Sequence, residues 1–182
     1  MIRGDLVRII QGKYQILCTP NGLPAMYENY KNNAALFEEY DWGRNSKWQC
    51  FIAIGKVHEW PQLVVSIKYD LEGGLYPGVL LMPDTTIAFI GAGELILIYD
   101  VDEPRLIDVD RADAGFHTWE QHEDIVLLSA ELEFAAWDTR GNKLWTTFVE
   151  PPWGYAINDK LITLDVMGEK TTFSIHQGPD RK

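Results

Sequence analysis

The sequence has few cysteines and no long apolar run. Its two cysteines, Cys18 and Cys50, lie 32 residues apart, and neither belongs to a CxxC pair, so we expect free thiols. No run of about 18 apolar residues occurs, so no membrane-spanning segment is expected. The first ten residues, MIRGDLVRII, contain neither an apolar signal-peptide core nor a small-residue cleavage site. These absences predict a cytoplasmic protein.

Positive charge is also scarce. The chain has 16 Lys and Arg against 27 Asp and Glu, which gives a formal net charge of −11. Such a chain repels nucleic-acid phosphates and anionic lipid, so neither is an expected partner. Residues 100–124 hold nine acidic residues and two arginines. This segment predicts an acidic surface that attracts a basic protein partner, with Asp102, Glu103, Asp108 and Asp110 as candidate contacts. The alternative is a solvated rim that maintains solubility.

Motifs that carry catalysis or hold a cofactor are missing as well. The chain has no GxSxG, and Gly91-Ala-Gly93 is followed by an expected strand rather than by a helix, so it predicts a turn and not a phosphate loop. His117 and His122 are five residues apart in FHTWEQHED, a segment that is expected to be an acidic loop and that matches no HExxH helix. We therefore nominate no catalytic residue, no metal site and no cofactor.

Short apolar segments separated by turn residues dominate what is present. The chain of 182 residues, with 46% hydrophobic and 12% aromatic residues, is long enough for one domain with a packed core, residues 1–182. Turn chemistry such as TPNG, YPG and TRGN joins the segments, which predicts an all-β fold of antiparallel hairpins in a meander. Both a sandwich and propeller-like blades fit this pattern. Residues 6–10 form a short apolar segment. The expected strands are residues 13–18, 48–54, 63–69, 79–82, 86–90, 95–100, 105–109, 125–129, 132–138, 143–149, 161–166 and 171–175.

One helix is expected, over residues 27–40. Its apolar positions recur at intervals of three and four residues: Tyr27, Tyr30, Ala34, Phe37 and Tyr40. Gly43 is placed to end it. The stripe is typical of a helix that packs on its own sheet, although a binding face for a partner fits the same spacing.

An internal repeat covers roughly residues 79–178. Residues 87–107 align with residues 125–145 at an offset of 38 without a gap, and residues 161–174 continue the pattern at an offset of 36 from residues 125–138. Tyr99 falls on Trp137, and each precedes an aspartate that opens a turn. Related approach segments, GVLLMPDTT, GFHTWEQHED and GYAINDK, precede the units. The alternative is that any two β-hairpins align equally well.

This period resembles the blade repeats of β-propellers, including the PQQ-type and WD-type. The resemblance covers about the last 100 residues, and it implies four-stranded antiparallel blades. The GH and WD signatures and a recurrent tryptophan-docking motif are missing, and only two and a half to three units fit, whereas propellers need at least about four blades. The stretches AELEFAAWD and VEPPWGY are similar to stretches in uncharacterised bacterial proteins, a likeness that implies no function.

The segment Glu131–Tyr155 predicts a hairpin that is covered on both faces. A loop at residues 139–142 places Ala136 opposite Trp145 and Trp137 opposite Leu144. One face then carries Leu132, Phe134, Ala136, Trp145, Thr147 and Val149, and the other carries Glu131, Glu133, Ala135, Trp137, Leu144, Thr146 and Phe148. Both faces are apolar near the turn, as expected for a strand pair between two layers.

The two ends of this segment are candidate binding residues. Glu131 and Glu133 are two apart beside Trp137, and paired carboxylates next to an aromatic ring are what glycoside cleavage needs. The alternative is a solvated strand end. Trp153 and Tyr155 follow two prolines, which predicts a rigid corner that serves either as a binding platform or as a plug for the core.

Three function hypotheses follow from these observations. The leading one is a non-enzymatic binding or protein-interaction domain with an acidic surface. The alternative is a carbohydrate-active enzyme or sugar-binding domain that uses the paired glutamates and tryptophans. A third is a subunit that completes a propeller-like ring by forming a homo-oligomer.

Overall fold

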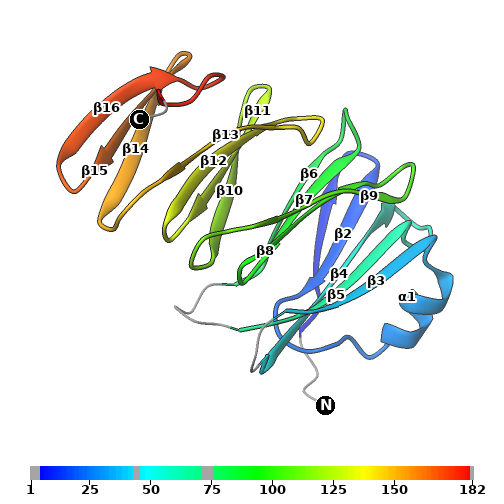
Figure 1. The fold of residues 1–182 in the computed structure, drawn as a ribbon. Helices are drawn as coiled ribbons and strands as arrows, with labels where there is room; N and C mark the ends of the chain where they lie inside the picture. Colours follow the sequence, from blue (N-terminus) through cyan, green and yellow to red (C-terminus); the bar gives the residue numbers. More distant parts are fainter. Residues whose placement is uncertain (1–4, 43–45, 71–75, 181–182) are drawn as a thin grey trace.

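The computed structural model describes residues 5–42, 46–70 and 76–180. Within these ranges the chain forms four β-sheets and one short helix, α1 (Tyr27–Asn33), which confirms the expected all-β class (Figure 1).

The first sheet, in the order β1-β2-β4-β5-β3, contains β1 (Val7–Gln11), β2 (Tyr14–Thr19), β4 (Trp48–Lys56), β5 (Leu63–Tyr69) and β3 (Leu36–Asp41). The second contains β6 (Gly78–Met82), β7 (Ile87–Ala92), β8 (Leu95–Asp100) and β9 (Arg105–Arg111). The third contains β10 (Phe116–His122), β11 (Ile125–Ala130), β12 (Glu133–Asp138) and β13 (Lys143–Phe148). The fourth contains β14 (Trp153–Asn158), β15 (Leu161–Val166) and β16 (Glu169–Ser174).

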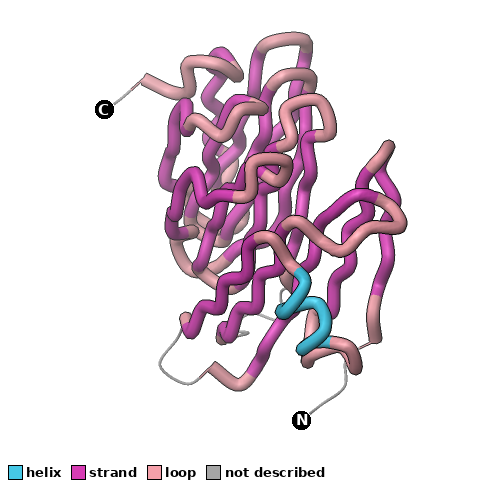
Figure 2. The backbone as a smooth tube through the Cα atoms, turned by 90° about the vertical axis from the view of Figure 1, so that its right-hand side faces the viewer, coloured by secondary structure: helices cyan, strands magenta, loops and turns pink. Residues whose placement is uncertain are grey.

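The last three sheets are simple meanders, since their strands pair in chain order. All their pairs are antiparallel, as short loops between consecutive strands require. The four sheets stand one behind the other like propeller blades (Figures 1 and 2). The first sheet departs from this rule because β3 pairs with β5 in parallel, a pairing that the sequence did not predict.

The internal repeat is a structural repeat. Strands β7, β8 and β9 correspond to β11, β12 and β13 at the offset of 38, and β15 and β16 continue it at 36. Both full units also contain a β-bulge at the same place, between Ile98 and Tyr99 and between Ala136 and Trp137. The three approach segments form β6, β10 and β14, so each is the first strand of its sheet.

Apolar layers hold neighbouring sheets together. Between the first and second sheets, fully buried side chains include Ile52, Ile67, Ile90 and Tyr99. The second layer joins the second and third sheets around Phe89, Phe116, Ala135 and Trp137. The third layer joins the third and fourth sheets around Phe134, Trp145, Ile162 and Phe173. Strand β12 therefore contributes to two layers, so the first strand of the hairpin is covered on both faces as expected. The second strand is not, because β13 exposes Leu144, Thr146 and Phe148.

The two end faces of the series differ from these inner faces. On the first sheet, α1 covers Phe51 and Val64, and Tyr27 and Tyr30 pack against them (Figure 1). On the fourth sheet, the face away from the third sheet carries small and polar residues except for Leu161, and Thr163 and Thr172 share a hydrogen bond of 3.2 Å across it. A polar face of this kind suits contact with water.

The expected helix over residues 27–40 is wrong in its second half. Helix α1 ends at Asn33, Ala34 is extended, and residues 36–41 form β3. The periodicity misled because Ala34 and Phe37 do contact the same apolar cluster as Tyr27 and Tyr30, but Ala34 is the extended residue after the helix and Phe37 lies on β3. Pairing with the buried strand β5 outweighs the weak local preference for a helix.

Two further expectations need correction. The segment around His117 and His122 was expected to be an acidic loop, but it is β10, and residues 153–158 form β14. In the hairpin, Ala136 lies opposite Trp145 as expected, but Trp137 lies opposite Lys143 rather than Leu144. The bulge accounts for this shift, because it leaves Leu144 as the extra, exposed residue.

Candidate functional site

The cleft between the third and fourth sheets is the strongest candidate site, because it contains two of the expected binding residues. It has a volume of about 820 Å³ and lies between β10 and β14, the first strands of their sheets. A smaller cleft of about 280 Å³ lies between β6 and β10. His117 and Thr118 line both clefts, so β10 separates them.

One wall of the larger cleft is polar and comes from β10. Alternation along a strand points every second side chain to one face, and Thr118, Glu120 and His122 follow that rule. The intervening Trp119 points to the other face, where it packs against the second sheet. Thr118 and Glu120 are exposed at this wall, and His122 is half-buried.

The opposite wall is aromatic and comes from β14. Trp153 and Tyr155 are half-buried and nearly parallel, with ring centroids 6.3 Å apart. Tyr155 stacks on Phe134 of the third sheet at 4.5 Å, and Trp153 donates a hydrogen bond from Nε1 to the carbonyl oxygen of Glu131 at 3.3 Å. Contacts with the third sheet therefore hold both rings in place on the side away from the cleft. The sequence left open whether they form a binding platform or a plug for the core. In the structure both rings pack against the third apolar layer and also line the cleft.

Two hydrogen bonds join the walls. The Tyr155 hydroxyl donates to Oε2 of Glu120 at 2.7 Å, and a ring nitrogen of His122 lies 3.2 Å from the carbonyl oxygen of Asp159. Burial raises the pKa of Tyr155, and the hydrogen bond to the Glu120 carboxylate raises it further, so the phenol stays protonated at neutral pH. The Glu120 carboxylate is consequently held at the edge of an aromatic surface.

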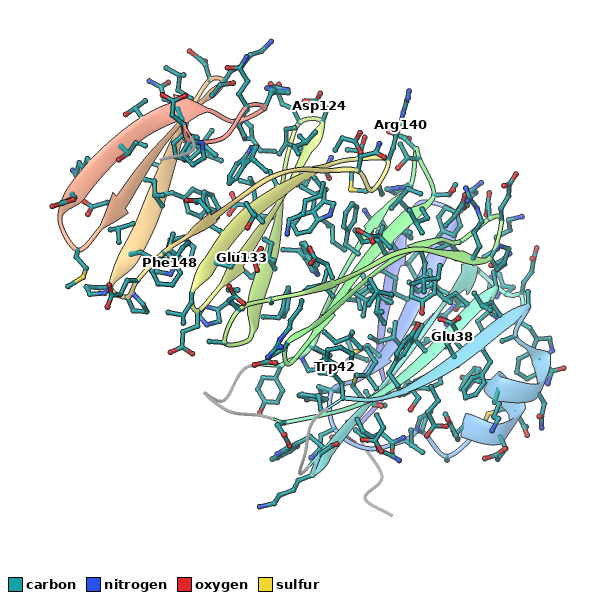
Figure 3. All side chains as sticks on the ribbon, in the orientation of Figure 1. Glu38, Trp42, Asp124, Glu133, Arg140 and Phe148 are labelled. Atoms are coloured by element: carbon teal, nitrogen blue, oxygen red, sulfur yellow. The ribbon has the colours of Figure 1, made fainter. Side chains whose placement is uncertain are left out.

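Glu133, in contrast, is a buried structural residue. Its side chain is 7% exposed, and Oε1 accepts hydrogen bonds from Lys143 at 3.1 Å and from Thr146 at 2.6 Å (Figure 3). The backbone N–H of Asp113 donates to its other oxygen at 3.3 Å. Glu133 therefore binds groups of its own chain. Glu131 precedes the strand, and the two carboxylates do not share one cleft in the described residues.

Trp137 cannot stack on a sugar, because its side chain is 0% exposed. It packs edge-on against Trp119 at 5.6 Å, and the Lys143 ammonium lies 5.0 Å from its ring centroid. The sugar-binding hypothesis required an accessible Trp137 beside two accessible glutamates. This arrangement does not form, so the structure removes the basis of that hypothesis.

The acidic residues of segment 100–124 divide between two edges. Strand β9 forms one edge of the second sheet, and β6 forms the opposite edge of that sheet. Strand β10 forms an edge of the third sheet and contacts β6. At the β9 edge two of the candidate residues have cationic partners. Asp102 pairs with Lys13 at 3.3 Å, and Asp110 pairs with Lys143 at 2.7 Å. The candidate residues Glu103 and Asp108 are exposed there. The continuous acidic surface predicted from the sequence is thus two separate rows.

Metal-binding geometry is not found in the part of the chain that the structure describes. No group of three His, Cys, Asp or Glu side chains lies within reach of a common ion in residues 5–42, 46–70 and 76–180. His117, Glu120 and His122 line the same cleft, but they do not form such a group. In the same ranges, no helix is long and apolar enough to cross a membrane.

Sequence reasoning missed Thr118, Glu120 and His122 as one wall of a cleft. In the segment FHTWEQH, the polar residues Thr118, Glu120 and His122 recur at every second position, which is the period of a strand. That signal was obscured by the two flanking acidic runs and by the bulge between Phe116 and Thr118. Once β10 is a strand, its polar row faces the aromatic row of β14 directly.

Comparison with known proteins gives only distant structural likenesses. No protein-family model matches the sequence, and no curated protein matches it significantly. Among solved structures, Hsv2p of Kluyveromyces lactis aligns with a TM-score of 0.42 and 12% identity over 90% of this chain and 42% of that one. Hsv2 of Kluyveromyces marxianus aligns with a TM-score of 0.40 and 10% identity over 92% and 49%. The chain spans less than half of the length of either structure.

Proposed function

We propose that the protein is a non-enzymatic binding module that recognises a basic segment of a partner protein in the cleft between β10 and β14. One observation carries the proposal: the Glu120 carboxylate is held by Tyr155 at 2.7 Å at the edge of an aromatic wall. A guanidinium or ammonium group gains from a carboxylate and from the face of a Trp or Tyr ring at the same time. The cleft offers both to one side chain.

The charge distribution supports a basic rather than an acidic ligand. The whole chain carries a net charge of −11, and the exposed acids Glu103, in the turn before β9, and Asp108, on β9, form part of the acidic row at this edge. Charges outside a binding site raise the rate of encounter with an oppositely charged partner, and salt screens this effect. In this proposal the cleft provides the contact, and the acidic row provides long-range attraction. The two free cysteines agree with a cytoplasmic setting, which forms part of the proposal.

Binding of a short arginine-containing peptide tests the proposal by isothermal titration calorimetry. A peptide of the same length, with glutamine in place of arginine, serves as the ligand control. We expect binding of the arginine peptide only, weakening as salt rises. Glu120→Gln is expected to weaken it by roughly threefold or more, because the variant removes the charge from the ion pair. Trp153→Ala is expected to weaken it further, because the aromatic wall is lost.

A matched control separates a site from general attraction to an acidic protein. Glu169 on β16 is exposed and does not line the cleft, so Glu169→Gln changes the net charge by the same amount as Glu120→Gln. The proposal is rejected if both glutamine variants weaken binding equally, or if the arginine and glutamine peptides bind alike.

A further inference from the structure

Strand β1 presents an unpaired backbone edge. It is the first strand of the five-stranded sheet, and in the described residues it pairs only with β2. In an antiparallel ladder, alternate residues direct their N–H and C=O groups away from the partner strand. On the outer side of β1, these groups are therefore available to another strand.

The side chains of β1 are unusual for an exposed edge. Four aliphatic residues are exposed in this short stretch: Leu6 at 42%, Val7 at 49%, Ile9 at 50% and Ile10 at 60%. Two other edge strands, those of the fourth sheet, place different residues in water. Strand β14 exposes Gly154, Ala156 and Asn158, and β16 exposes Glu, Lys and Thr side chains. Polar and charged edge residues discourage pairing with other chains, whereas an exposed aliphatic edge favours it.

An apolar groove lies beside this edge. It has a volume of about 710 Å³ between β1, β2, α1 and the loop after β4, and it is lined by Leu6, which immediately precedes β1, and by Arg8 of β1. Met26 and Trp60 are each 48% exposed on its opposite side. The other face of β1 carries the alternate residues Val7, Ile9 and Gln11. There the Gln11 side-chain amide donates to the Leu81 carbonyl at 3.1 Å. Side chains of an added strand would therefore reach apolar surface on both faces.

The charge of Arg8 favours an acidic residue on a strand added to this edge. Among the described residues it has no ion-pair partner, although the protein has a large excess of carboxylates. Its cross-strand neighbour is the apolar Leu17. An acidic residue opposite Arg8 on an added strand would complete a cross-strand ion pair. A second copy of the chain fits less well, because two molecules of net charge −11 repel each other. The register that aligns the aliphatic residues would also place two copies of Arg8 opposite each other.

We propose that β1 accepts an extended peptide segment of another protein as an antiparallel strand. In this complex an acidic residue lies opposite Arg8, and apolar residues lie opposite Leu6 and Ile10. Main-chain hydrogen bonds along the edge supply affinity, and the alternate side chains in the groove supply selectivity. This site is separate from the cleft between β10 and β14 and does not depend on it.

Two synthetic peptides test the proposal. The first is an extended peptide of valine, isoleucine and threonine with one central glutamate, and the second has glutamine at that position. Hydrogen exchange of the full-length protein is measured with and without each peptide. We expect the glutamate peptide to slow exchange of the amides in residues 6–11 and to bind about threefold more tightly than the glutamine peptide, as an exposed ion pair allows.

Matched variants identify the residues responsible. Arg8→Gln should remove the difference between the two peptides, whereas Arg140→Gln, an exposed arginine on the β12–β13 turn, should leave it unchanged (Figure 3). Ile10→Lys should abolish binding without unfolding the protein, because Ile10 is 60% exposed; circular dichroism checks the fold. Glu120→Gln should leave this binding unaltered, so failure here and failure of the proposed function are distinguishable.

Three results would overturn the inference. Protection that falls outside residues 6–11 would place the peptide elsewhere. Equal affinity of both peptides for the unaltered protein would remove the role of Arg8. Sedimentation that reports a dimer without peptide, with residues 6–11 protected in it, would identify a second copy of the chain as the occupant.

Discussion

The second and third sheets are two copies of one unit, yet the residues that face the preceding sheet differ in polarity. Leu95 and Tyr99 on β8 correspond to Glu133 and Trp137 on β12 at the offset of 38. All four side chains are buried. In the second sheet the polar group is the Tyr99 hydroxyl, and in the third sheet it is the Glu133 carboxylate. The repeat thus preserves which positions are buried, while each interface satisfies its polar groups in its own way.

The two polar groups draw on different neighbours. The Tyr99 hydroxyl donates to Glu38 on β3, and Tyr40 donates to the same carboxylate at 2.6 Å. Glu38, which is labelled in Figure 3, is therefore shared by two phenols from two sheets. Glu133 instead joins the second and third sheets through Lys143, which also pairs with Asp110 on β9 at 2.7 Å. The comparison shows that burial recurs along the chain, whereas polar partners are specific to each interface.

The largest expected effect concerns the residues that face the following sheet. Trp145→Ala should lower the free energy of unfolding by about 3–5 kcal/mol, because a buried indole leaves a cavity. Trp145 also donates from Nε1 to the Ile175 carbonyl at 2.6 Å, and a Cβ on Gly178 would lie 2.5 Å from its Cγ. Chemical denaturation measures the change. The equivalent Ile107 is half-buried, so Ile107→Ala should cost only about 1–2 kcal/mol.

Phe148 supplies the control for this experiment. It lies on the same strand as Trp145 but is 66% exposed (Figure 3). Phe148→Ala should therefore change the free energy of unfolding by no more than about 0.5 kcal/mol. A denaturation midpoint of Trp145→Ala that equals that of the unaltered protein would contradict the role of the third apolar layer.

The next effect concerns the buried carboxylate. Glu133→Gln should cost about 1–3 kcal/mol, because it removes the charge that Lys143, Thr146 and the Asp113 N–H contact, while Lys143 keeps Asp110. Glu131→Gln is the control, since its side chain has no ion pair in the described residues. Urea denaturation compares the two variants. Equal stability of both would mean that Glu133 is a solvated strand end, as one sequence interpretation held.

Several parts of this comparison could be predicted from the sequence. The offset of 38 placed Tyr99 on Trp137, and alternation placed Phe134 and Trp137 on opposite faces of a strand that is covered on both sides, because strand periodicity is strict. The polar partners could not be predicted. Glu38 reaches Tyr99 from a segment that was expected to be helical, and contacts between residues 61 positions apart leave no local signal.

The candidate cleft was half predicted, for a related reason. Trp153 and Tyr155 were found because an aromatic corner after two prolines is visible in the sequence. Glu120 was grouped with its acidic neighbours in sequence, but the strand alternation of β10 turns it toward Tyr155 and away from the β9 edge. The topology of the sheets decides which edge each charged residue occupies. The composition of residues 100–124 therefore suggested one acidic surface, whereas the fold divides its nine acidic residues between two sheet edges.

A smaller effect depends on pH. Burial and the hydrogen bond to Glu38 raise the pKa of Tyr40 from 10.0 to about 12, and burial together with Glu38 and Tyr40 raises that of Tyr99 further. Since the unfolded chain then releases these protons at lower pH than the folded one, the stabilisation is complete below pH 10 and is lost as pH rises through about 12. Denaturation midpoints are measured between pH 9 and pH 12. Above about pH 10 the midpoint should fall more steeply with pH for the unaltered protein than for Tyr99→Phe. Equal slopes would contradict the shared carboxylate.

The smallest expected effect tests whether equivalent positions of the repeat do the same work. Asp100 and Asp138 each open the turn after the aromatic residue. Oδ1 of Asp100 accepts from the Glu103 N–H at 3.2 Å, and Oδ1 of Asp138 accepts from the N–H groups of Arg140 and Asn142, both at 2.9 Å. Each alanine substitution should cost about 1 kcal/mol, with Asp138→Ala the more costly because its carboxylate closes two backbone bonds. Thermal denaturation of both variants, with Asp108→Ala on the β9 edge as control, measures the difference. If Asp100→Ala were the more destabilising, the Thr86 hydroxyl, which donates to the same oxygen of Asp100 at 2.9 Å, would be the stronger contact, and the two turns would be alike in sequence only.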